Sequence, residues 1–186
     1  MPPHRAFTTR YPNRARVLIT KIKICEPSTT EEVNAKKVVL KEYAAIWDTG
    51  ATNSAITKKV VDDLKLKPSG VAEVRHAKGK SATNTYLINI ALPSQVMFGQ
   101  MRVTEAELIP DDGAPEEEQP QVLIGMDIIG AGDFAVTNLN GKTVLSFCLP
   151  SSREIDFIPD ANRQNLGGTR AERRANEREL KRKGIL

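Results

Sequence analysis

One carboxylate stands where an apolar run ends. Residues 44–57 read AAIWDTGATNSAIT, so four apolar residues lead directly into Asp48, which Thr49 and Gly50 follow. Burying a carboxylate without a partner is costly, so Asp48 is either a capping residue near the surface or a group tuned for chemistry. For the second role, Gly50 would let backbone N–H groups approach the carboxylate and favour its charged form, and the Thr49 hydroxyl could brace the turn.

The chemistry that suits such a turn is general acid–base catalysis. One carboxylate can act as a general base, but hydrolysis of a peptide bond by an activated water works better with two carboxylates that share one proton. The chain contains no second Asp-Thr-Gly or Asp-Ser-Gly. The pair would therefore come from two copies of the chain, related by a two-fold axis through the site.

The elements around this turn are predicted to be mainly strands. β-branched residues with partial alternation predict strands over residues 16–25 and 38–47, and the second strand delivers Asp48. Apolar residues at helical spacing predict a short helix over 57–65, with Thr57 as its N-cap. Further strands are predicted over 71–93 (two strands around a polar, mobile tip at 77–81), 98–108, 121–126 and 134–148 (a hairpin with Asn140-Gly141 as its turn).

Three of these segments resemble one known family. WDTGATNSAI, the hairpin around Gly79 and VLIGMDIIG, in this order and at this spacing, resemble the retropepsins, the retroviral-type aspartic proteases. The helix after the active-site turn, and Gly-Met-Asp after the later strand, resemble their retrotransposon and bacterial relatives. The resemblance covers about residues 15–150. It implies a mainly all-β fold, a retropepsin-like barrel with short helices whose active site lies at a homodimer interface.

The resemblance also implies roles for single residues. Asp48 from each subunit would form the catalytic dyad, Thr49 would interlock across the dimer axis, and Gly50 would donate a hydrogen bond to the dyad. Substrate would contact Ala51 in the cleft, Ile124 beside the active-site loop, and the tip of a flap formed by the hairpin. The flap-tip residues are Ala77, Lys78, Gly79 and Lys80.

The chain departs from the retroviral pattern in two places. The flap tip is more basic than the glycine-rich retroviral tips. The arginine that follows the second glycine in retroviral proteases is absent, and Met126 and Asp127 stand there instead. The salt bridge that this arginine makes at the retroviral dimer interface is therefore not expected here.

The charge is unevenly distributed along the chain. Residues 1–24 contain six basic residues and no acidic one, residues 170–183 contain seven basic residues and three glutamates, and the rest is net acidic. We expect a basic N-terminal arm (1–14), the protease domain (15–158) and a basic, helical tail (159–186). Basic tails are either solvated or attracted to an acidic partner such as nucleic acid.

Other classes of protein and site are not favoured. No apolar run approaches the roughly 20 residues of a membrane span, and no apolar segment follows the basic start, so a cytoplasmic protein is expected. The two histidines lie near no cysteine or carboxylate at ligand spacing, so neither a metal nor a cofactor is expected. Cys25 and Cys148 are expected to be thiols rather than a disulfide.

The sequence thus favours a homodimeric aspartic endopeptidase that acts on an extended peptide or protein substrate without a cofactor. The alternative is a dimeric module of the same fold that binds a peptide or protein with negligible proteolysis. A third possibility is that the basic tail is the functional end and directs the domain to nucleic acid.

Overall fold

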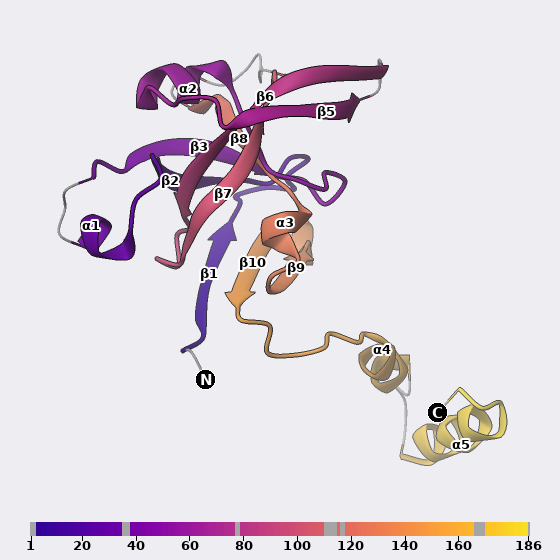
Figure 1. Cartoon of the computed structure of the whole chain (residues 1–186). Coiled ribbons are helices and arrows are strands. Elements are labelled where there is room, and N and C mark those ends of the chain that lie inside the picture. Colours follow the sequence, from indigo (N-terminus) through magenta and orange to yellow (C-terminus); the bar gives the residue numbers. More distant parts are fainter. Residues whose placement is uncertain are drawn as a thin grey trace. The chain divides into compact units, whose positions relative to one another are not determined.

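The computed structural model describes residues 3–34, 38–76, 79–109, 115, 118–165 and 170–185. The chain divides into two compact units, Met1–Ser152 and Arg153–Leu186 (Figure 1). Within the part of the chain that is described, no helix is both long and apolar enough to cross a membrane.

The first unit is built around a closed barrel. Seven strands form one sheet in the order β2-β3-β8-β4-β7-β6-β5, and an additional pairing of β2 with β6 closes six of them into the barrel. The predicted mainly β barrel with short helices is confirmed. The strands are β2 (Ile19–Cys25), β3 (Lys41–Trp47), β4 (Ala55–Ile56), β5 (Gly70–His76), β6 (Gly79–Ala91), β7 (Met97–Glu105) and β8 (Pro120–Ile124).

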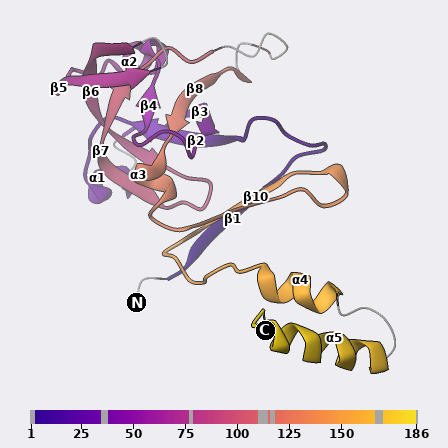
Figure 2. The same cartoon turned by 90° about the vertical axis from the view of Figure 1, so that its right-hand side faces the viewer.

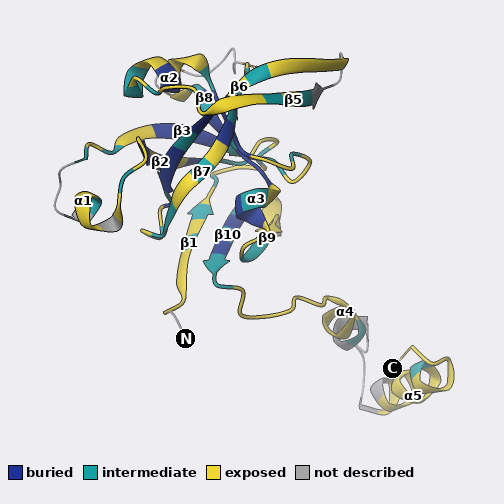
Figure 3. Cartoon of the chain, in the orientation of Figure 1, coloured by how far each residue is buried: buried dark blue, intermediate teal, exposed yellow. Residues whose placement is uncertain are grey.

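Alternating side chains fill the barrel. In β2, Ile22 and Ile24 are buried whereas Lys21 and Lys23 are exposed, because successive side chains of a strand point to opposite faces. The same alternation buries Val122 in β8, and Figure 3 shows the buried strands converging at the centre of the barrel. The β-branched residues that predicted strands therefore also supply the core.

A second, three-stranded sheet has the order β1-β10-β9. It consists of β1 (Arg5–Arg10), β9 (Asp133–Thr137) and β10 (Val144–Leu149), and β1 runs beside β10 (Figure 2). The predicted hairpin between β9 and β10 is confirmed. Its loop contains Asn140 and Gly141, both at positive φ (53° and 73°), a region that asparagine and glycine tolerate.

Part of the expected N-terminal arm (residues 1–14) is the strand β1, where the sequence predicted no strand. Residues 5–10 pair along their whole length with β10, from Arg5 opposite Leu149 to Arg10 opposite Val144. The strand was missed because it contains a single large apolar residue, Phe7, among threonines and arginines. Its place is decided by the partner strand rather than by its own pattern.

An aromatic cluster joins the second sheet to the barrel. Trp47 is 4% exposed and stacks on Phe134 at a centroid distance of 5.7 Å. It also meets Phe7 and Phe147 in tilted contacts at 5.7 Å and 5.2 Å, and its indole N–H donates to Oγ1 of Thr20 at 2.9 Å. Aromatic pairs in this distance range are favourable, so the end of β3 is held firmly in place. Trp47 is thus a core residue.

The helix α2 (Lys58–Leu64) follows β4, close to where the sequence predicted it. Thr57 occupies the N-cap position with an extended backbone, as predicted, but its hydroxyl makes no bond to the helix and donates to Oε1 of Gln121 instead. Lys65 ends the helix in the left-handed conformation (φ 51°). A short helix, α3 (Met126–Ile129), follows β8.

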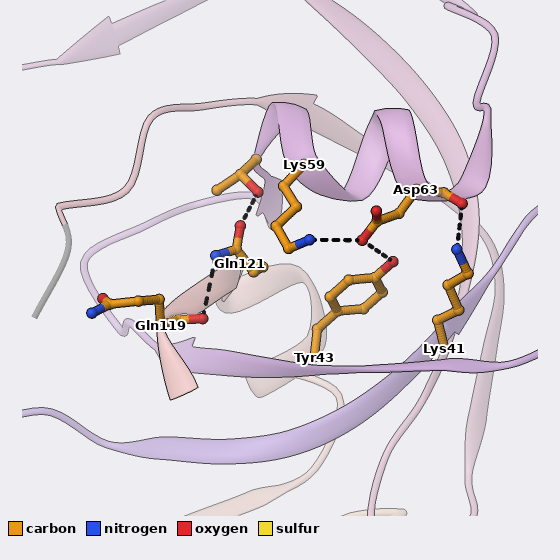
Figure 4. A network of polar contacts seen from close by, with 7 residues as sticks. Lys41, Tyr43, Lys59, Asp63, Gln119 and Gln121 are labelled. Carbon is orange, nitrogen blue, oxygen red and sulfur yellow. Dashed lines mark hydrogen bonds and ion pairs between the residues drawn. The ribbon is translucent and has the colours of Figure 1, made fainter. Parts of the chain in front are cut away.

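A polar network attaches α2 to the beginning of β3 (Figure 4). The Lys41 ammonium donates to the backbone carbonyl of Asp63 at 2.6 Å. The Tyr43 hydroxyl donates to Oδ2 of Asp63 at 3.2 Å, and the Lys59 ammonium lies 3.4 Å from the same oxygen. Burial, together with the neighbouring Asp63 carboxylate, raises the pKa of Tyr43, so the phenol stays protonated and keeps this hydrogen bond.

A further short helix, α1 (Thr30–Asn34), lies where the sequence suggested only a polar stretch. The sequence feature that indicates this helix is a capping box formed by Thr29 and Glu32. The N–H of Glu32 donates to Oγ1 of Thr29 at 3.2 Å, and the N–H of Thr29 donates to the Glu32 carboxylate at 2.8 Å.

The second unit contains two helices, α4 (Ile158–Asn165) and α5 (Arg170–Arg182). Two ion pairs with i,i+4 spacing lie along α5 and just after it: Lys181 lies 3.0 Å from Glu177, and Lys183 lies 2.6 Å from Glu179. The sequence from Thr169 to Glu172 has the pattern of a capping box, but Thr169 lies outside the described residues. The helix α4 lies at the start of the segment expected to be a helical tail, and Pro159 near its first residue is a known helix-start signal.

Candidate active site

Asp48 follows directly after Trp47, the last residue of β3. β3 and β8 run parallel, with Trp47 opposite Ile124. One residue further along, the N–H of Asp48 donates to the carbonyl of Ile124 at 2.9 Å. The chain then turns through residues 49–54, so Asp48 is half-buried and its neighbours Thr49 and Gly50 are exposed.

The Asp48 carboxylate is held by its own turn. The N–H of Gly50 donates to Oδ1 of Asp48 at 2.8 Å, and the N–H of Ala51 donates to the Asp48 carbonyl at 3.3 Å. A side chain on Gly50 would begin 3.1 Å from Oδ1 of Asp48, so glycine keeps one side of the carboxylate open. Asp48 therefore caps no helix, and its carboxylate is oriented at the surface of the barrel.

The segment after β8 completes the site from the other side. A Cβ atom on Gly125 would lie 2.7 Å from the backbone carbon and 2.8 Å from the oxygen of Asn53, so only glycine fits there. The N–H of Met126 donates to the carbonyl of Ala51 at 2.8 Å, and the N–H of Asp127 donates to the carbonyl of Thr52 at 3.1 Å. The turn after Asp48 and the segment after Ile124 thus lie in direct backbone contact.

Ile124, which the resemblance predicts to contact substrate, has its side chain in the barrel core. Its side chain is 0% exposed because strand alternation points it, with Val122, into the barrel core. We therefore assign Ile124 the role of holding Asp48 through its carbonyl group. Ala51, in contrast, is half-buried on the turn.

The predicted flap is the hairpin of β5 and β6, which extends beyond the barrel (Figure 1). At its tip, Gly79 lies opposite His76 with a φ of 126°, a conformation that suits glycine. Lys80 forms an ion pair with Glu73 across the hairpin at 2.8 Å. Ala77 and Lys78 lie outside the described residues.

Two residues of the site were not recognised from the sequence. Ser54 is 0% exposed, and its hydroxyl donates to Oδ1 of Asp127 at 2.8 Å. Asp127 was noted only as a departure from the retroviral pattern. The available signal was a small polar residue directly before the apolar pair Ala55-Ile56, six positions after Asp48, but its partner lies 73 residues away.

Among the residues that the structure describes, no group of three or more His, Cys, Asp or Glu side chains could hold a metal ion. The groups that the structure does place at this site are the Asp48 carboxylate and a turn of backbone N–H groups.

Solved structures of several proteases are similar to this chain. The retropepsin-like aspartic protease from Rickettsia conorii is 14% identical, with a TM-score of 0.43, and the match covers 78% of this chain and 95% of that chain. The EIAV protease in complex with the inhibitor HBY-793 is 17% identical, with a TM-score of 0.42 and coverages of 62% and 86%. The protease of simian foamy virus is 15% identical, with a TM-score of 0.34 and coverages of 60% and 92%.

Sequence comparison assigns the family. No curated protein sequence matches the chain. A family profile described as aspartyl protease matches residues 32–128, more than half of the 186 residues, and the match includes both Asp48 and the segment from Gly125 to Asp127. The family predicted from the sequence is confirmed, and the chain belongs to the aspartyl protease family.

Proposed function

We propose that two copies of this chain form an aspartic endopeptidase in which each copy supplies Asp48 to a catalytic dyad. The observation that carries the proposal is the placement of Asp48, a half-buried carboxylate at the end of β3 that is oriented by the N–H of Gly50. The chain has one such turn, and one carboxylate cannot act as base and acid at the same time. Thr49, exposed beside it, would interlock with its counterpart across the two-fold axis.

The dyad would work with a single shared proton. The ionised Asp48 takes a proton from a water molecule, whose oxygen forms a bond to the carbonyl carbon of the substrate. The protonated Asp48 donates to the carbonyl oxygen and stabilises the tetrahedral intermediate. Transfer of a proton to the amide nitrogen breaks the C–N bond, and the dyad returns to one shared proton. The reaction requires no cofactor.

The substrate would be an extended peptide or protein segment. Such a segment can add as a strand and bind mainly through backbone hydrogen bonds. Ala51 would line the cleft, and the flap tip from Ala77 to Lys80 would close over the peptide. A cytoplasmic location and attraction of the basic tails to nucleic acid stay predictions.

A peptide digest tests the proposal. A complex peptide mixture is incubated with the wild type, with Asp48→Asn and with Asp62→Asn at pH 4 to 7, and new termini are identified by mass spectrometry. Asp62 is an exposed carboxylate on α2, paired with Lys58, and serves as the matched control. We expect the wild type and Asp62→Asn to produce the same new termini and Asp48→Asn to produce none.

The dimer is tested in the same assay. Increasing amounts of Asp48→Asn are added to a fixed amount of wild type. Exchange of subunits replaces active pairs by pairs with one carboxylate, so activity should fall as the variant is added. Constant activity would show that each subunit works alone. Equal products from the wild type and Asp48→Asn, with a dimer in solution, would favour the dimeric binding module instead.

A further inference from the structure

We propose that Ser54 and Asp127 act as a positioning pair that holds the active-site turn, residues 48–54, from within the same subunit. The inference rests on the proposed function of Asp48. Neither residue needs to touch substrate for this role. Together they would keep the turn in the geometry that a dyad requires before the second subunit arrives.

Both oxygens of the Asp127 carboxylate are used inside the subunit. The backbone N–H of Ser54 donates to Oδ2 at 2.9 Å, and the Ser54 hydroxyl donates to Oδ1 at 2.8 Å. The N–H of Ile128 also donates to Oδ1, at 3.0 Å. An ionised carboxylate can accept at both oxygens at once, so one side chain holds the last residue of the turn by two bonds.

The Ser54 hydroxyl has one orientation that satisfies its surroundings. It accepts a hydrogen bond from the N–H of Gly125 at 3.1 Å while it donates to Asp127. The residue is 0% exposed, so water cannot replace either partner. A continuous chain of hydrogen bonds therefore runs from Gly125 through Ser54 to Asp127.

This chain of bonds reaches Asp48 through one residue. Gly125 follows Ile124, and the carbonyl of Ile124 accepts the N–H of Asp48 at 2.9 Å. The remaining bonds between the turn and the segment after β8 are made by backbone atoms and can form with many sequences. The bonds of Ser54 and Asp127 are the described side-chain ties between these two segments, so they are where the sequence specifies the position of the turn.

The position of Asp127 agrees with this role. Met126 stands where a retroviral arginine would form a salt bridge across the dimer interface. The neighbouring carboxylate, that of Asp127, instead accepts hydrogen bonds from Ser54 in the turn of its own subunit. The turn would thus be held by Asp127 of the same subunit, and not by an arginine at position 126.

Two variants test the pair, each with a defined defect. Asp127→Asn keeps the shape but places an NH2 group against either the N–H or the hydroxyl of Ser54. Ser54→Ala leaves the N–H of Gly125 without its partner. We expect each to lower kcat by about 10- to 100-fold, as small misplacements of reacting groups do, with KM changed less than about twofold because substrate contacts are kept. The double variant should be no slower than the slower single variant, because the two residues act as a unit.

Asn89→Ala is the matched control. Asn89 is also buried (1% exposed) and also joins two segments, since it donates to the carbonyl of Ser28 and accepts the N–H of Gln100, both at 2.8 Å. This substitution should lower stability without lowering kcat. Hydrogen exchange provides a readout that does not depend on catalysis: amides of residues 48–54 should exchange faster in Asp127→Asn and Ser54→Ala, but not in Asn89→Ala.

The possible outcomes separate the two proposals. Unchanged kcat and unchanged exchange of the turn in Asp127→Asn would overturn the positioning role while the protease stands. A loss of kcat equal to that of Asn89→Ala would also overturn it, because the effect would then be general destabilisation. If the wild type produces no new termini beyond those that Asp48→Asn produces, the proposed function fails. Faster hydrogen exchange confined to residues 48–54 in Asp127→Asn and Ser54→Ala would still support the positioning role of Ser54 and Asp127. Should Ser54→Ala fail to fold, Asp127→Asn decides alone.

Discussion

At the scale of single residues, the site depends on how closely two backbone segments approach each other. Gly125 lies so near Asn53 that a methyl group in its place would overlap the backbone at 2.7 Å. The backbone, unlike the end of a flexible side chain, cannot move aside cheaply. The contact therefore couples the residue after β8 to the turn that carries Asp48.

The first prediction concerns this glycine. Gly125→Ala should lower the free energy of unfolding by about 1–3 kcal/mol, the usual cost of forcing extra atoms into a packed site, and should abolish cleavage because the turn must shift. Gly99→Ala is the control, since a Cβ there meets its nearest neighbour at 3.8 Å, an ordinary contact. Urea unfolding and the peptide digest measure both effects. Equal stability of the two variants would contradict the packing argument.

Some of the site could be predicted from the sequence and some could not. Asp48, Gly50 and Gly125 are recognisable because their types and local neighbours encode the turn and the close approach. The bond between Ser54 and Asp127 could not be predicted, because it depends on how β3 and β8 pair in three dimensions. Strand alternation in β8 predicts a buried Ile124, but the family resemblance led to the expectation of a substrate contact.

At the scale of elements, the least expected feature is the strand β1. Longer apolar strands and the hairpin at Asn140-Gly141 were predicted because their patterns are strong. β1 and α1 are short and polar: β1 is stabilised by its pairing with β10, and α1 by the local capping box of Thr29 and Glu32. β1 contributes one ring, Phe7, to the aromatic cluster around Trp47.

The second prediction tests the importance of β1. Phe7→Ala removes the contacts of that ring with Trp47 and Phe147. Because Phe7 is half-buried, we expect a loss of about 2 kcal/mol of unfolding free energy, below the range for fully buried phenylalanines. Thr8→Ala, at an exposed position of the same strand, should change it by less than about 0.5 kcal/mol. Thermal or urea unfolding measures both, and equal effects would show that the ring does not anchor the strand.

At the scale of the whole molecule, the three tyrosines of the chain behave alike. Burial raises the pKa of Tyr11, Tyr43 and Tyr86, and for the latter two a carboxylate hydrogen bond adds to the effect. A phenol whose pKa is higher in the folded state holds its proton more tightly there. Its contribution to stability is complete below the unfolded value near 10 and is lost as the pH rises above it.

The third prediction follows from this shift. Above pH 10, the free energy of unfolding should fall by up to about 1.4 kcal/mol per pH unit for each such tyrosine. Tyr43→Phe should reduce that slope by about one tyrosine's share. Urea unfolding between pH 8 and pH 11 measures the slope, and tyrosinate absorbance should rise together with unfolding rather than before it. Ionisation of the tyrosines in the folded protein near pH 10 would contradict the prediction.

The aromatic cluster at the end of β3 has one more consequence. Trp47 is the only tryptophan in the chain, and it immediately precedes Asp48. Its indole is enclosed by aromatic rings and anchored by Thr20. Excitation at the red edge of protein absorbance therefore selects a single emitter one residue from the carboxylate. The protein carries its own fluorescent label, with which unfolding, and the proposed peptide binding and subunit exchange, can each be followed beside Asp48 without chemical modification.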